Sequence, residues 1–122
     1  MTKLKVLNIV MAKLWGGGEQ YVYDICQEMR SRDIEVYVAV DKSNIEFQNK
    51  FSKVAIVVCL ELYRSAGLLS LLELKRFIEK NSINIVNCHS GRGMLLSMLL
   101  KTCTRVKLIA FKHNVISSKN DF

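Results

Sequence analysis

Strand-like and helix-like segments alternate along this whole chain, and that alternation constrains the fold more than any other feature. Runs of branched apolar residues predict five strands, at residues 5–12, 34–40, 54–60, 83–88 and 106–111. Amphipathic spacing predicts helices between them, at residues 18–32, 43–52, 68–80 and 93–103. Ser43 and Glu46 predict a capping box at the start of the second helix, with Phe47 and Phe51 on one of its faces. Alternating strands and helices form a parallel sheet covered on both faces. The sequence therefore predicts a single Rossmann-like α/β unit over residues 1–122 with strand order 3-2-1-4-5.

The order of these strands also predicts where a ligand would bind. Open parallel sheets bind ligands beyond the carboxyl ends of the strands, where the strand order reverses. That point lies here between the first and fourth strands. The segments 13–19, 89–93 and 112–114 follow the first, fourth and fifth strands and bring five of the six glycines and both histidines to this edge.

The glycine run that follows the first strand has two interpretations. Gly16, Gly17 and Gly18 open a helix, and glycine lets a ligand approach the free N–H groups that bind anions there. A tight turn from strand to helix also favours glycine, so the run alone does not decide. The neighbouring Trp15 is either a lid or stacking residue or a surface anchor, and Glu19 is either a helix cap or a ligand contact.

Polar residues at the ends of the later strands are further site candidates. His89 and His113 each end a strand, and two histidines at one edge favour a functional role over simple hydrogen bonding. Arg92 either holds an anionic group at the same edge or is solvated.

Charge and cysteine content exclude several classes. The net charge of +7 permits anion or membrane-surface contact, but basic residues are not clustered with aromatic ones, so nucleic-acid binding is not expected. The four cysteines form no C-x-x-C pair, which predicts buried thiols and no zinc site. No secretory signal or membrane-spanning run is evident, which predicts a cytoplasmic protein, at most peripheral to a membrane.

Two other functions remain open at this point. Asp41 ends the second strand 23 positions after Gly18, near the spacing of the acid that binds ribose in NAD(P)-dependent oxidoreductases. The 122-residue length also suits a stand-alone flavodoxin-like module that binds a partner.

Four motifs resemble the N-terminal domain of the family-4 glycosyltransferases, which are retaining enzymes of the GT-B fold. The motifs are Gly17-Gly18-Glu19-Gln20 at the first helix, residues 29–38, residues 84–90 and residues 111–114. Asn84 and Asn87 stand where the family often has Asp and His.

The resemblance implies a nucleotide-sugar donor and a polysaccharide or glycolipid acceptor of the cell surface. Gly17 and Gly18 would approach the donor diphosphate, and His113 would face the transferred sugar. The acceptor side of the cleft would include Trp15, Glu19, His89, Ser90, Arg92 and Asn114. No metal or other cofactor is expected. The chain would be the acceptor-side half of a GT-B enzyme, inactive without a C-terminal donor-binding domain.

Overall fold

The computed structural model of the chain describes residues 3–62, 68–88 and 107–110. These contain a five-stranded parallel sheet in the order β3-β2-β1-β4-β5. The strands are β1 (Lys5–Ile9), β2 (Glu35–Asp41), β3 (Ile56–Leu60), β4 (Ile85–Cys88) and β5 (Lys107–Ala110). The sheet order expected from the sequence is therefore confirmed.

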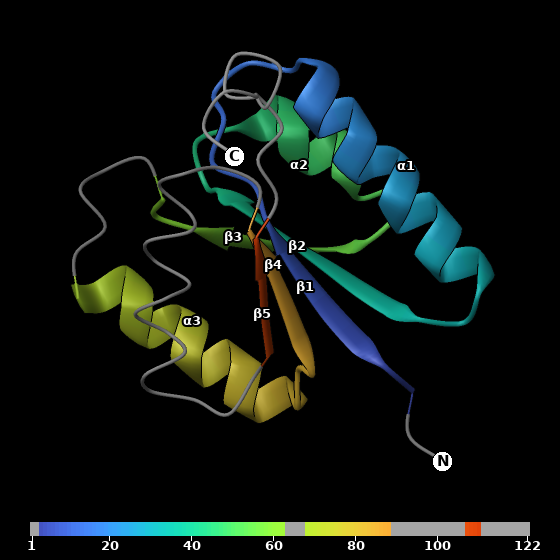
Figure 1. Cartoon of the computed structure of the whole chain (residues 1–122). Helices are drawn as coiled ribbons and strands as arrows, with labels where there is room; N and C mark the ends of the chain where they lie inside the picture. The colour runs from blue at the N-terminus through green and yellow to red at the C-terminus, as the bar shows by residue number, and fades with distance from the viewer. Residues whose placement is uncertain (1–2, 63–67, 89–106, 111–122) are drawn as a thin grey trace, which may run out of the picture.

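Three described helices cover the two faces of the sheet. They are α1 (Gly17–Ser31), α2 (Ile45–Phe51) and α3 (Leu68–Asn81). Figure 1 shows α1 and α2 on one face and α3 on the opposite face. The α/β class with helices on both faces is confirmed, whereas the helix expected at residues 93–103 lies outside the described residues.

A hydrophobic core lies on each face of the sheet, which explains why the strands read as continuous apolar runs. Leu7 and Ile9 of β1 pack with Leu74 and Ile78 of α3 on one face. The core of the other face contains Val10, which follows β1, together with Val22 of α1 and the two phenylalanines of α2. Each fully buried aliphatic side chain stabilises the fold by about 1.5–3 kcal/mol, so these two cores hold the strand ends in place.

The third strand departs from expectation. The sequence predicts a fully buried strand from Val54, but β3 begins at Ile56 and lies at the edge of the sheet. Ile56 is 53% exposed, and Cys59 is exposed as well. An edge strand has a neighbour on one side only, so its apolar residues are less completely covered. The prediction of buried thiols therefore holds for Cys26 and is wrong for Cys59.

The start of α2 also differs from the predicted capping box at Ser43. The N-cap is Asn44, whose side-chain oxygen accepts a hydrogen bond from the Phe47 backbone N–H at 3.1 Å. Glu46 instead forms an ion pair with Lys50, 3.4 Å away along the helix. Two adjacent residues of good capping type compete here, and the structure selects the second.

None of the described helices combines the length and the apolar character needed to cross a lipid bilayer.

Candidate functional site

The carboxyl edge of β1 is the centre of the predicted site. β1 lies between β2 and β4, and Ile9 at its end is in register with Cys88 at the end of β4. The strand order reverses here, as expected. The chain leaves β1 through residues 10–16 and enters α1, whose first turn lies at this edge of the sheet (Figure 1).

The first turn of α1 leaves donor groups available. Gly16 is the N-cap, with an extended backbone, and the first intrahelical bond runs from the Gln20 N–H to the Gly16 carbonyl at 3.0 Å. The N–H groups of Gly17, Gly18 and Glu19 precede that bond and have no acceptor within the helix. Together with the positive end of the helix dipole, they suit an anion.

Glu19 acts as a helix cap in this structure. Its Oε1 accepts a hydrogen bond from the Gly16 N–H at 2.8 Å. The carboxylate is also favourably placed against the positive end of the α1 dipole. Of the two roles left open for Glu19 by the sequence, the geometry provides direct support for capping.

The local fold does not require glycine at position 17. No described glycine has a positive φ angle, and a Cβ built on Gly17 meets no other heavy atom of the described chain within 4 Å. At Gly16 the same atom would lie 3.4 Å from Glu19 Oε1, an ordinary contact. The absence of a side chain at Gly17 therefore leaves open space beside the first turn of α1, which is what close approach of a ligand needs.

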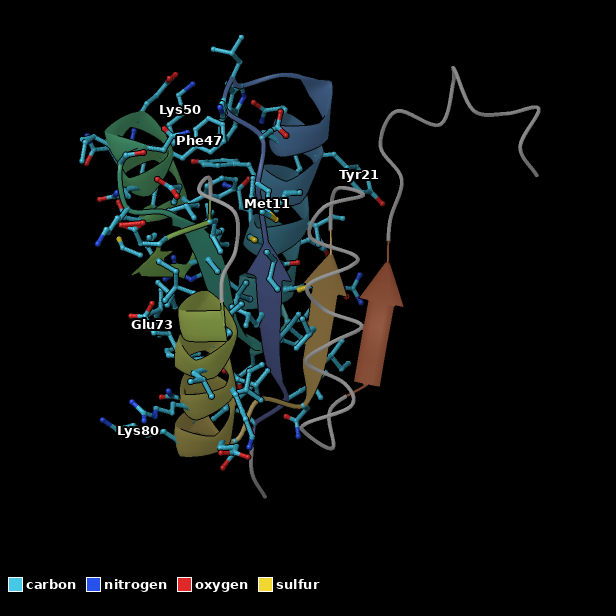
Figure 2. All side chains as sticks on the ribbon, turned by 90° about the vertical axis from the view of Figure 1, so that its left-hand side faces the viewer. Met11, Tyr21, Phe47, Lys50, Glu73 and Lys80 are labelled. Carbon is cyan, nitrogen blue, oxygen red and sulfur yellow. The ribbon has the colours of Figure 1, made fainter. Side chains whose placement is uncertain are left out.

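Trp15 is anchored to the helices. The Trp15 ring is half-buried, with centroid distances of 5.4 Å to Phe47 and 5.2 Å to Phe51 on α2. Its Nε1 donates a hydrogen bond to Gln20 Oε1 at 3.3 Å. The Lys50 ammonium lies 4.4 Å from the ring centroid, within the range of a cation–π contact. Figure 2 shows Phe47 and Lys50 on α2.

Asp41 has a structural role. Its Oδ2 accepts hydrogen bonds from the backbone N–H and the hydroxyl of Ser43, and its Oδ1 accepts one from the Leu62 N–H at 2.6 Å. The side chain is buried. Because both carboxylate oxygens hold loops of the chain, this arrangement gives no support to the ribose-binding role considered from the sequence.

A buried amide pair joins β1 and β4. Asn87 Nδ2 donates to Asn8 Oδ1 at 3.1 Å, and Asn8 Nδ2 approaches Cys26 Sγ at 3.7 Å. Asn87 Oδ1 has no hydrogen-bond partner within the part of the chain that the structure describes. Burial raises the pKa of the Cys26 thiol from 9.0 to about 12, so this cysteine stays protonated and unreactive.

A cavity of about 450 Å³ lies at the other end of the sheet, lined in part by Lys3, Arg30 and Asp33. Lys3 pairs with Asp33 at 3.0 Å, and Arg30 donates to the Lys53 carbonyl at 2.9 Å. These charges are already partnered within the chain, and the cavity is remote from the glycine run.

Five of the predicted site residues fall in other parts of the chain. His89, Ser90, Arg92, His113 and Asn114 lie outside the described residues, so their roles stay predictions. Among the described residues, no cluster of histidine, cysteine and acidic side chains is suited to hold a metal ion.

Sequence reasoning missed the support that α2 gives to the glycine run. The spacing of Phe47 and Phe51 indicated one face of a helix, but nothing in it indicated that this face packs on Trp15. A single tryptophan directly before a glycine run, in a chain with an i, i+4 phenylalanine pair, was the available signal.

Several solved structures have a similar fold. A glycosyltransferase from Rickettsia africae ESF-5 matches with a TM-score of 0.69 and 15% identity over 98% of this chain and 34% of its own. Anabaena Alr3699/HepE in complex with UDP-glucose gives a TM-score of 0.74 with 15% identity, over 96% of this chain and 31% of its own. Acinetobacter baumannii MurG gives a TM-score of 0.67 with 12% identity, over 88% of this chain and 34% of its own. The chain therefore spans about one third of the length of these proteins.

The sequence model of Glycosyltransferase Family 4 matches residues 15–121. The chain belongs to this family, as the four motifs predicted. No curated protein sequence gives a significant match. Family membership decides against the oxidoreductase alternative and agrees with the structural role of Asp41.

Proposed function

We propose that the protein takes part in sugar transfer from a nucleoside-diphosphate sugar, and that the first turn of α1 meets the donor diphosphate. The observation that carries this proposal is the open space at Gly17, where the fold itself needs no glycine. Two similar structures are complexes of Alr3699/HepE with UDP and with UDP-glucose, which supports a nucleotide sugar as the donor.

The chemistry required at this place is stabilisation of negative charge. Transfer of a sugar leaves a diphosphate, whose developing charge is stabilised by preorganised N–H donors and a helix dipole. The N–H groups of Gly17 and Gly18 would supply this without a metal ion. His113 would face the transferred sugar, and transfer would proceed with retention of configuration.

The acceptor would lie on the same side of the sheet edge. His89, Ser90, Arg92 and Asn114 follow the fourth and fifth strands in the chain and would line that side of the cleft. Trp15 and Glu19 would contribute mainly by shaping the loop, because the ring is packed on α2 and the carboxylate caps α1.

The 122 residues would form the acceptor-side domain of a GT-B enzyme. A second domain would supply the opposite wall of the cleft and most donor contacts, and the acceptor-side domain alone would be inactive. The acceptor would be a polysaccharide or glycolipid of the cell surface, reached from the cytoplasm at the inner face of the membrane. The charge of +7 is compatible with that position because anionic lipids attract basic residues.

The test starts from the protein as its native cell makes it. Its intact mass is measured first, and an intact species two to three times the 14.0 kDa of this chain would match the proposed two-domain enzyme. Transfer from a panel of nucleotide sugars is then assayed for the wild type, for His113→Ala and for Lys80→Ala, an exposed residue at the end of α3 (Figure 2).

The proposal predicts transfer by the wild type and by Lys80→Ala, with a severe loss in His113→Ala. Absence of binding and transfer with every nucleotide sugar in the panel would contradict it. Full activity of His113→Ala would remove that residue from the mechanism.

A further inference from the structure

Trp15 connects the glycine run to a helix that is distant in sequence. The residue directly precedes Gly16, the N-cap of α1, and its ring lies against two fully buried phenylalanines of α2. It also meets Tyr23 of α1 edge-on, at a centroid distance of 6.2 Å. The ring is therefore held by both helices at once, at the position where α1 begins.

A second tie joins the same loop to the start of α2. Asn44 Nδ2 donates to the Lys13 carbonyl at 3.4 Å, and Asn44 also caps α2 through the Phe47 N–H. The loop after β1 is thus attached to α2 through a backbone carbonyl as well as through the Trp15 ring.

The contacts of Lys50 complete the arrangement. Its ammonium lies 4.4 Å from the centroid of the Trp15 ring and 3.4 Å from the Glu46 carboxylate. The Lys50 side chain is therefore a third partner of the Trp15 ring from α2, beside the two phenylalanines. Trp15 therefore has three partners on α2, while a Cβ at Gly17 would meet no heavy atom of the described residues within 4 Å.

We propose that Trp15 is a positioning residue for the donor loop, through which α2 sets the location of the Gly17 and Gly18 N–H groups. The proposal rests on the function proposed above. Trp15 does not touch the donor; it fixes the loop that does. Donor groups must be placed to within a fraction of an ångström of the developing charge, and a ring held by three aromatic neighbours provides that rigidity.

The test compares three variants of the protein as its native cell makes it. Trp15→Leu removes the aromatic contacts and the bond to Gln20, whereas Trp15→Phe loses that bond but keeps an aromatic ring on α2. Ile78→Val is the matched control, because Ile78 is buried on α3 at the opposite face of the sheet and its change lowers stability without reaching the loop.

Two quantities are measured. The first is the pair of steady-state constants, KM for the nucleotide sugar and kcat. The second is the rate of hydrogen exchange at the Gln20 amide, which makes the first intrahelical bond of α1 with Gly16. Trp15→Leu should raise KM about tenfold or more and speed exchange at Gln20. Trp15→Phe should keep KM and the Gln20 exchange rate close to the wild-type values, and Ile78→Val should change neither KM nor that exchange rate.

The outcomes separate this proposal from the proposed function. If Trp15→Leu leaves KM and Gln20 exchange at the values of Ile78→Val, the positioning role is wrong, although the sugar transfer stands. If the wild type binds no nucleotide sugar but Trp15→Leu still speeds exchange at Gln20, the sugar-transfer proposal fails and the loop-positioning role of Trp15 survives. Equal KM values for Trp15→Phe and Trp15→Leu would also overturn the argument, since it depends on the aromatic ring.

Discussion

Replacing Gly17 by alanine separates a glycine that the fold needs from a glycine that a ligand needs. Gly17 is the first residue of α1, has no positive φ angle, and has open space where a Cβ would stand. Alanine is the better helix residue and restricts the unfolded chain, which together stabilise compatible sites by about 0.4–1 kcal/mol. The free energy of unfolding of Gly17→Ala should therefore equal that of the wild type or exceed it by up to about 1 kcal/mol.

Donor binding should change in the opposite direction. The added methyl group would occupy the open space at the first turn of α1 and keep the diphosphate from its closest approach. A lost hydrogen bond to a charged group costs about 1.5–3 kcal/mol, which corresponds to a loss of donor affinity of about 10- to 100-fold. Stability is measured by urea unfolding and affinity by calorimetric titration with the donor. Ser31→Ala, at the far end of α1, is the control that raises helix propensity away from the loop.

Either of two results would refute this reasoning. Wild-type donor affinity in Gly17→Ala would show that the open space does not serve the diphosphate. A clear loss of stability would show that the fold does need glycine at this position.

Three other predictions follow from the described residues. Asp41→Asn should lower the free energy of unfolding by about 2–3 kcal/mol, because its amide nitrogen would face a backbone N–H. The control Asp24→Asn, at an exposed position, should lower it far less. Equal effects of the two changes in urea unfolding would contradict the structural role of Asp41. In the folded chain a maleimide reagent should modify the exposed Cys59 and leave the buried Cys26 unmodified, which peptide mass mapping measures. Rapid modification of Cys26 would contradict its burial. Burial raises the pKa of Cys26 from 9.0 and that of Tyr37 from 10.0, each to about 12, so the unfolded chain loses these protons first. Stability should then be complete below pH 9 and fall between pH 9 and 12. Cys26→Ala should reduce this fall but not abolish it, because Tyr37 remains. Urea midpoints that stay constant over that window, or that fall as steeply in Cys26→Ala as in the wild type, would contradict this prediction.

The sheet order could be predicted from the sequence because each strand is an apolar run and each crossover an amphipathic segment. The exposure of β3 could not be predicted in the same way, because residues 54–60 are as apolar as the central strands. Whether such a run lies inside a sheet or at its edge depends on which strands come to lie beside it, and that is a property of the whole chain.

The site was predictable in its location and less so in its details. The end of β1 and the glycine run could be identified from the strand order and the family motifs. The support of Trp15 by Phe47 and Phe51 depends on contacts between segments about 30 positions apart, which a local pattern does not show. Asn44 similarly takes the capping role expected of Ser43, because two suitable residues stand side by side.

The most direct test of the central claim is a crystal structure of the protein, as its native cell makes it, with the donor nucleoside diphosphate bound. The account predicts phosphate oxygens within hydrogen-bonding distance of the Gly17 and Gly18 N–H groups, at about 2.7–3.2 Å, with the Trp15 ring still packed on α2. A diphosphate bound elsewhere, with the first turn of α1 facing only solvent, would contradict it.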